Sequence, residues 1–149
     1  MTTSRLSEDE QHRRWRSFIE REGLASLMND TKWRNLVVAL EHHWEGPRWR
    51  VKRLTAAEPD PFHGAYEPHL YGMDWRGVEW LDLDPTVMGS KGKLLPERVI
   101  ANHTPAIVRV LRSVHAPYSR EGDLIRVWGY ARPGKFPNLE PRAQPGSRG

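Results

Sequence analysis

The residues best suited to chemistry are three carboxylates in the segment VEWLDLDP, residues 78–85: Glu79, Asp82 and Asp84. In a strand, successive side chains point to opposite faces, so Asp82 and Asp84 share one face and Glu79 lies on the other. Two closely spaced carboxylates offer the oxygen ligands that hard divalent cations prefer. A catalytic metal site normally also needs a third protein ligand and a group that activates the substrate, and the sequence indicates neither.

The alternative role of these carboxylates is structural, because basic residues lie on the other predicted strands. These residues are Arg48, Arg50, Lys52, Arg53 and Arg126. Opposite charges on neighbouring strands stabilise a sheet by roughly 0.2–1 kcal/mol per pair. We therefore interpret Glu79, Asp82 and Asp84 as a structural acidic strand in which Asp82 pairs with a basic neighbour. We expect no metal, no cofactor and no catalytic residue.

A second group of interest is Asp74-Trp75-Arg76, a predicted turn that places an aromatic ring between opposite charges. Interface hot spots favour tryptophan, tyrosine and arginine, and loops commonly carry binding function. The alternative is that Trp75 covers the edge of the core, because tryptophan is usually well buried. We predict a binding surface that combines this turn with the basic strand face of Arg48, Arg50 and Lys52, which would suit an acidic partner.

Three helices are predicted around these segments. The first begins at the capping box Ser7–Glu10 and runs to about Glu22, where Gly23 ends it. The second begins at Asn29 or Asp30, and its apolar residues recur at helical spacing, which predicts a buried stripe. The stripe residues are Trp33, Leu36, Val37, Leu40 and Trp44. The third helix follows Thr104 as cap and Pro105 at its first position.

Strands are predicted over 48–54, 69–75, 76–85 and 123–132, with a tight connection at Arg76-Gly77. The segment 86–102 is expected to be irregular. Short, closely spaced strands favour antiparallel pairing. The predicted fold is α+β: a single domain with a mainly antiparallel sheet of about four strands and two or three helices packed on it. Residues 1–27 form an N-terminal helical extension, 28–136 the folded domain and 137–149 a disordered Pro/Gly/Arg-rich tail.

Composition narrows the class of protein. At 149 residues the chain is long enough for one core. It contains no cysteine, which excludes disulfides and thiolate catalysis and fits a cytoplasmic protein. No apolar run in the sequence approaches the roughly 20 residues of a membrane helix, and the N-terminus does not resemble a secretory signal. The net charge is +4, but most of the excess lies in the tail, so the folded middle is nearly neutral.

Four segments together resemble a family of small bacterial domains of unknown function. The segments are Met28–Trp33, Pro47–Lys52, Val78–Asp84 and Leu111–Gly134. The shared features are an Asn-x-Thr-Lys-Trp start, an Ile/Val-Glu-Trp-Leu-Asp strand and an Arg-Val-x-Gly-Tyr final strand, over about residues 28–136. The resemblance implies a fold unit and no particular activity. Small single-domain members of this kind are similar in style to immunity proteins of bacterial toxin systems.

Two functions follow as expectations. The first is a non-enzymatic protein-binding domain, in the specific form of an immunity protein that neutralises a bacterial toxin by occlusion. The alternative is a nucleic-acid-associated protein that uses the arginine-rich strand 48–53 and the basic tail. The near-neutral middle favours the first, because affinity for nucleic acid depends strongly on positive charge.

Overall fold

The computed structural model describes residues 7–43, 47–63, 72–89 and 98–140. It is a single α+β domain whose main sheet has four antiparallel strands in the order β2-β3-β7-β6. The fold class predicted from sequence is confirmed. The helical elements are α1 (Glu8–Glu22), α2 (Asp30–His43), the short 3-10 helix η1 (Trp75–Gly77) and α4 (Thr104–Ser113). The strands are β1 (Ala25–Ser26), β2 (Arg48–Arg53), β3 (Val78–Asp84), β4 (Thr86–Gly89), β5 (Arg98–Asn102), β6 (Tyr118–Glu121), β7 (Leu124–Trp128) and β8 (Tyr130–Ala131).

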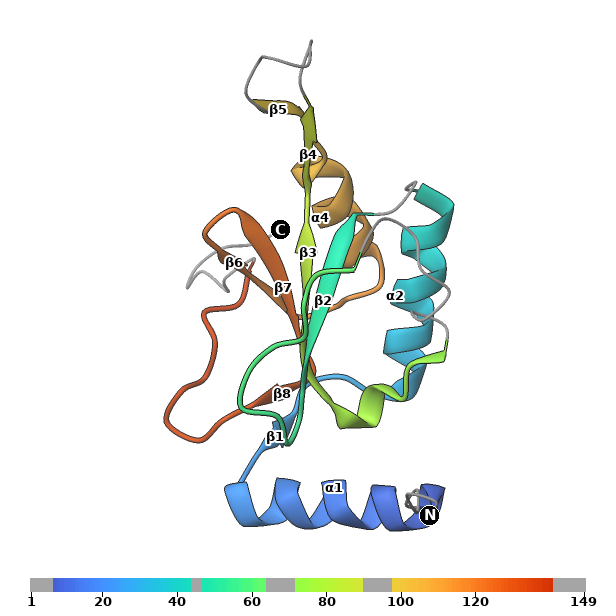
Figure 1. Cartoon of the computed structure of the whole chain (residues 1–149), viewed down its shortest axis with the longest axis vertical. Coiled ribbons are helices and arrows are strands. Elements are labelled where there is room, and N and C mark those ends of the chain that lie inside the picture. The colour runs from blue at the N-terminus through green and yellow to red at the C-terminus, as the bar shows by residue number, and fades with distance from the viewer. Residues whose placement is uncertain (1–6, 44–46, 64–71, 90–97, 141–149) are drawn as a thin grey trace, which may run out of the picture.

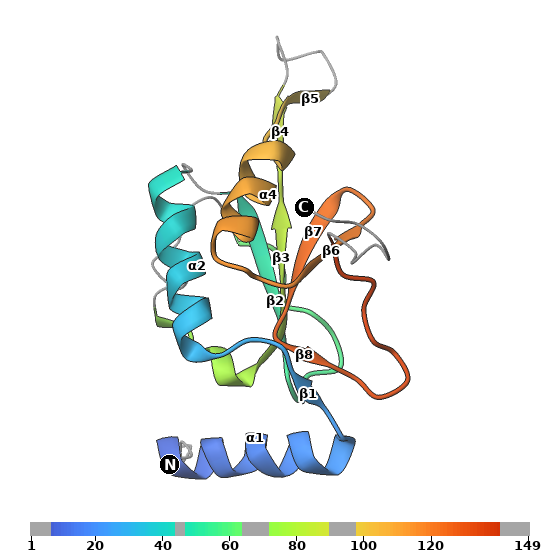
Figure 2. The ribbon, with the colours of Figure 1, turned by 180° about the vertical axis from the view of Figure 1, so that it is seen from behind.

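Helices α2 and α4 cover one face of the main sheet, and α1 lies crosswise below the sheet's lower end (Figure 1). The view from behind shows the same arrangement, with α2 and α4 now in front of the sheet (Figure 2). The β4–β5 hairpin extends beyond the opposite end, and β1 pairs with β8 close to α1. The molecule therefore places its first helix against the end of the sheet, close to β1 and β8.

The core lies between the sheet and the two covering helices. On α2, Trp33, Leu36, Val37 and Leu40 are all buried, as their helical spacing predicts, whereas Trp44 lies outside the described residues. They pack in one cluster with alternate residues of β3 and β7 and with the apolar face of α4. A second, smaller cluster of Leu24, Leu54 and Tyr130 receives the apolar side chains of α1.

The predicted first helix is also present, with the expected ends. The Ser7 side chain accepts a hydrogen bond from the Glu10 amide, and Gly23 adopts the left-handed conformation with φ of 66°. Both features are local, since a capping side chain and a residue tolerant of positive φ act within one turn of the helix. Local sequence therefore sets both ends of α1.

Three predicted segments differ in the structure. Of the strand predicted over 69–75, residues 69–71 lie outside the described residues. Residues 72–74 are not in a strand, and Trp75–Gly77 form η1 instead of a hairpin connection. The Asp74 side chain accepts the Arg76 amide, and such local bonds compete with strand formation. The segment 86–102, expected to be irregular, contains the paired strands β4 and β5. The single strand predicted over 123–132 is divided into β7 and β8, and the fourth strand of the main sheet is β6.

The ends of the described chain also make contacts. The Glu140 amide donates to the Tyr118 carbonyl at 2.7 Å, so residues just beyond 136 touch the edge strand β6. The remainder of the predicted tail, 141–149, lies outside the described residues. Among the described residues, no helix combines the length and apolar character that a membrane crossing needs.

Candidate functional site

Asp82 is the centre of an ion-pair network on the face of the sheet opposite the helices. The register places Arg50, Asp82 and Arg126 side by side on three neighbouring strands. The fully buried carboxylate accepts from Arg50 Nε at 3.0 Å, from Arg126 Nε at 2.7 Å and from Arg126 Nη2 at 3.1 Å. The Arg126 guanidinium also lies 3.6 Å from the centre of the Trp80 ring. This carboxylate therefore joins three strands through charged hydrogen bonds.

Glu79 and Asp84 also have partners within the fold. Glu79 accepts from Lys52 Nζ at 2.9 Å and from the Arg132 guanidinium at 2.8 and 3.0 Å. Burial alone would raise the pKa of Glu79, but these hydrogen bonds and charges outweigh it and lower the pKa. Asp84 accepts from the amide and hydroxyl of Thr86 at 3.0 and 2.7 Å, and Arg48 lies 4.0 Å away.

The predicted basic strand face is therefore largely neutralised from within. Arg50 and Lys52 each bind a buried carboxylate, and Arg48 lies over the Phe62 ring with its charge near Asp84. If Arg50 or Lys52 turned toward a partner, the buried carboxylate of Asp82 or Glu79 would lose one of its two basic partners, which is costly for a buried charge. The network therefore stabilises the sheet, and its side chains are poorly placed to bind another molecule.

The turn 74–76 divides into a buried and an exposed part. Trp75 is 8% exposed and stacks on Trp33 with ring centroids 4.3 Å apart, so its indole belongs to the core. The surface of the turn consists of Asp74, which is partly buried, and Arg76, whose side chain is 49% exposed. Arg76 Nε donates to Asp74 Oδ1 at 3.1 Å, so the two charges hold one another in place.

Beside this turn, a cavity of about 340 Å³ opens between α1, α2 and η1. Its charged lining residues are Glu8, Asp30 and Asp74 on the acidic side and Arg34 and Arg76 on the basic side. Val37 and Trp75 supply part of its apolar lining. A cavity with charges of both signs is suited to charged side chains or ions more than to an apolar ligand.

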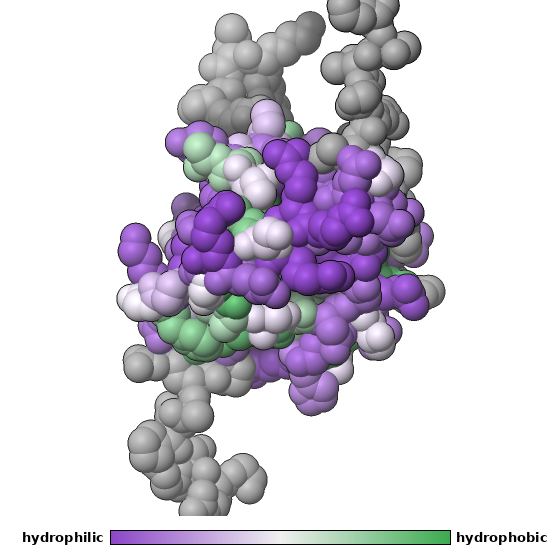
Figure 3. Space-filling view, turned by 90° about the horizontal axis from the view of Figure 1, so that it is seen from below, coloured by the Kyte–Doolittle hydropathy of each residue, from purple (hydrophilic) through white to green (hydrophobic). Residues whose placement is uncertain are grey.

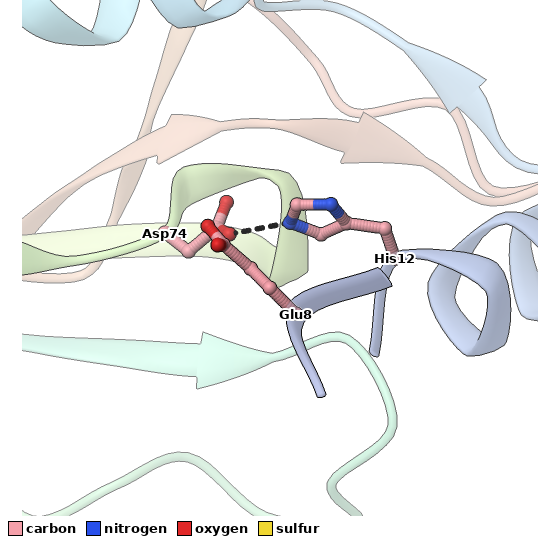
Figure 4. A group of neighbouring side chains, drawn as sticks. All are labelled: Glu8, His12 and Asp74. Atoms are coloured by element: carbon pink, nitrogen blue, oxygen red, sulfur yellow. Dashed lines mark hydrogen bonds and ion pairs between the residues drawn. The ribbon is translucent and has the colours of Figure 1, made fainter. Parts of the chain in front are cut away.

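His12 extends from α1 to Asp74, one of the residues that line this cavity. Its Nε2 lies 2.8 Å from Asp74 Oδ2, and Glu8, one turn earlier on the same helix, points toward the same place (Figure 4). Burial alone would raise the pKa of Asp74, but hydrogen bonds from His12 and Arg76 outweigh it and lower the pKa. Three potential ligand groups thus meet where α1 crosses the turn before β3.

A close contact holds α1 in this position. The Trp15 ring lies against Gly77 so tightly that an added Cβ would stand 2.2 Å from Trp15 Cζ2. Phe18 and Ile19 pack beside it on Leu54 and Tyr130. The Tyr130 hydroxyl donates to the Arg76 carbonyl at 2.9 Å, which links the second cluster to the turn. The end of the molecule that α1 covers is mostly hydrophilic on its outer surface (Figure 3).

The cavity therefore includes two predicted residues, Asp74 and Arg76, together with charged residues that sequence reasoning missed. The missed lining residues are Glu8, Asp30 and Arg34, and His12, which contacts Asp74 beside the cavity, was missed as well. The signal for two of them was present, because Glu8 and His12 are four residues apart in a helix that the capping box predicts, and such residues share one face. No local pattern connects this helix to Asp74, sixty-two residues after His12.

Comparison with known proteins places the chain in a family. A search of curated proteins and a search of solved structures each gave no significant match. Residues 15–134 match a family described as "Family of unknown function (DUF6678)". The match begins within α1 and extends beyond β8, so it includes Trp15, the turn 74–76 and the whole main sheet. The chain belongs to this family of unknown function, DUF6678.

Proposed function

We propose that the domain functions by binding another protein, and that an acidic side chain of the partner docks at the mouth of the cavity between α1, α2 and η1. The observation that carries this proposal is that Arg34 and Arg76 both line one open cavity. Guanidinium groups bind carboxylates through charged, directional hydrogen bonds. Arg34 is exposed on α2, and Arg76 keeps half of its side-chain surface exposed while Asp74 orients it.

The rigidity of the turn supports the proposal. The Trp75–Trp33 stack fixes the backbone beneath Arg76, and the Asp74 side chain accepts both the Arg76 amide and its guanidinium. A binding group that is already held in position loses less conformational entropy when a partner binds. The turn expected to bind is thus retained in the proposal, with Arg76 as the contact and Trp75 as its support.

Charge supports an acidic partner. The chain's net charge of +4, most of which lies in the C-terminal segment 132–149, attracts a negatively charged surface at long range. Arg48, Arg50 and Lys52 add little to this long-range attraction, because Asp84, Asp82 and Glu79 neutralise them. In this proposal Arg34 and Arg76 form the contact.

The specific partner class that we propose is a bacterial toxin, which the domain would neutralise by occluding it. This part rests on the similarity in style to small immunity proteins and concerns the partner's identity, not the surface used. A toxin-domain gene directly beside the gene for this chain would support it. Neighbouring genes for nucleic-acid metabolism would oppose it.

The second candidate function is association with nucleic acid, and it has its own observation. Arg13, Arg14 and Arg21 line a broad hollow on α1, and each is exposed. Arginines along one helix face are typical of contacts to phosphate groups. Glu10 shares the hollow, and the helix begins with three acidic residues, so its field is mixed.

A capture experiment distinguishes the two functions. The purified chain is used to retain a partner from nuclease-treated lysate of its own host, and affinity is then measured with that partner in pure form. Arg34→Glu should weaken binding at least tenfold. Arg109→Glu, an equal charge reversal at an exposed position on α4 outside the cavity, should leave binding unchanged.

Two results would contradict the proposal. Equal binding by wild type and Arg34→Glu would show that the cavity mouth is not the contact. Micromolar binding of single-stranded or duplex nucleic acid at physiological salt, lost on replacing Arg13 and Arg14 with glutamate, would favour the second candidate.

A further inference from the structure

Glu8, His12 and Asp74 bring three metal-ligating groups together from distant parts of the chain. Their ligand atoms all lie within 4.8 Å of one another. Glu8 and His12 occupy successive turns of one face of α1, and Asp74 approaches from the segment before β3 (Figure 4). We propose that these three side chains bind a divalent transition-metal ion, and we take Zn²⁺ as the probe.

The ligand types fit such an ion. One imidazole nitrogen and two carboxylate oxygens form a set that suits Zn²⁺ and its first-row neighbours, whereas Mg²⁺ and Ca²⁺ prefer oxygen ligands alone. Ligand atoms about 2.0–2.2 Å from zinc in a tetrahedral arrangement lie roughly 3.3 Å apart. The 2.8 Å contact between His12 and Asp74 would therefore open by about half an ångström, a change within side-chain reach.

Asp74 is already oriented for this role. Its Oδ1 accepts from the Arg76 amide and from Arg76 Nε, at 3.3 and 3.1 Å, which directs Oδ2 toward His12. Hydrogen bonds of this kind from neighbouring residues hold metal ligands in position and tune them. Arg76 Nη2 also donates to Oδ2, at a longer distance of 3.4 Å. An ion at Oδ2 would replace this long bond and the bond with His12, while the Arg76 amide and Nε remain on Oδ1.

His12 is positioned by the packing of α1. Its ring lies 5.5 Å from the Trp15 ring, and Trp15 is fixed in turn by its contact with Gly77. The His12 side chain is 18% exposed, so the imidazole is mostly shielded while its Nε2 contacts Asp74. Glu8 is exposed, so a change of its rotamer would bring its carboxylate to an ion held by the other two groups.

The cavity supplies the rest of the coordination shell. Glu8 and Asp74 both line it, and its volume of about 340 Å³ holds several waters at about 30 Å³ each. A metal ion held by these three side chains, with water completing its coordination, would link α1 to the turn before β3. The ion would stand on the α1 side of the cavity, whereas the proposed protein contact lies at Arg34 and Arg76.

Calorimetric titration of the untagged, metal-free full chain with Zn²⁺ tests the inference. We expect one ion per chain with micromolar affinity at pH 7, and much weaker binding of Mg²⁺. His12→Gln keeps a group that can donate to Asp74 but removes the imidazole ligand, and it should weaken Zn²⁺ binding at least tenfold. Glu8→Gln should also weaken it, while the matched change Glu10→Gln, outside the cluster, should not.

A second measurement covers the case in which a variant is unstable. Zn²⁺ should raise the melting temperature of the wild type and of Glu10→Gln, and raise it less in His12→Gln. Binding that is unchanged in His12→Gln, or a lack of saturable Zn²⁺ binding up to millimolar concentration, would overturn the inference and leave only a hydrogen bond between His12 and Asp74. These readouts use the isolated chain, so they are independent of the protein-binding proposal.

Discussion

Replacing Gly77 with alanine tests how closely α1 is fitted to the rest of the domain. The new Cβ would stand 2.2, 2.5 and 2.7 Å from three carbons of the Trp15 ring, closer than real Cβ contacts come. Gly77 is buried in η1, so either the ring or the helix that carries it must shift. Inserting a methyl group into a packed site typically costs about 1–3 kcal/mol. We expect a loss of this size in the free energy of unfolding.

A double-mutant cycle with Trp15→Ala separates the clash from other effects of the substitution. With the ring removed, the alanine Cβ at position 77 has no tryptophan to displace, so Gly77→Ala should cost little. The coupling free energy between the two changes should therefore be about 1–3 kcal/mol and favourable in the double variant, as expected for residues in direct contact.

Urea denaturation followed by circular dichroism gives the four free energies of the cycle. Gly72→Ala is the matched control, because an added Cβ there meets nothing within 4 Å, and it should leave stability nearly unchanged. A Gly77→Ala cost that is the same with and without Trp15 would refute the close packing of α1 on η1.

Three further predictions concern the sheet and the turn. Asp82→Asn should lower the free energy of unfolding by about 3 kcal/mol in denaturation, because it leaves two arginines without their buried partner, whereas Asp84→Asn should cost no more than about 1 kcal/mol. Glu79 has a lowered pKa, so its contribution to stability is complete above its ordinary value of 4.5 and is lost as the pH falls through the lowered value. Glu79→Gln should be less stable at pH 7 and lose less stability than wild type on acidification, as measured by melting temperature. Trp75→Ala should lower the free energy of unfolding by about 3–5 kcal/mol, because it removes a buried aromatic ring. A thermal melt should therefore show a lower melting temperature for this variant.

Sequence predicted best what is determined locally. The capping residues of α1 and the apolar stripe of α2 act within one or two helical turns, and both appear in the structure. The alternation of basic and apolar residues over 48–52 correctly predicted β2. The run of strand-favouring residues after Gly77 correctly predicted β3. The opposite charges on these strands lie on directly paired residues, because the antiparallel register brings Arg50 beside Asp82.

The remaining features depend on contacts between distant segments. The segment before β3 forms η1 because Asp74 caps it and the Trp75 ring stacks on Trp33 of α2. No local sequence pattern identifies Trp33 as this partner. Strand β6 is short and partly polar, so its sequence does not identify it as a strand. It pairs with β7 because the chain reverses at Gly122, which has a positive φ. The cavity requires α1, α2 and η1 together, so its lining could not be assembled from spacing.

Site-specific photo-crosslinking to the captured partner tests the central claim, protein binding at the cavity mouth, most directly. A crosslinking residue at position 38, exposed one turn after Arg34 on α2, should form a covalent adduct with the partner protein. The same residue at position 120, exposed on β6, should not. An adduct at position 120 with none at position 38 would contradict the account.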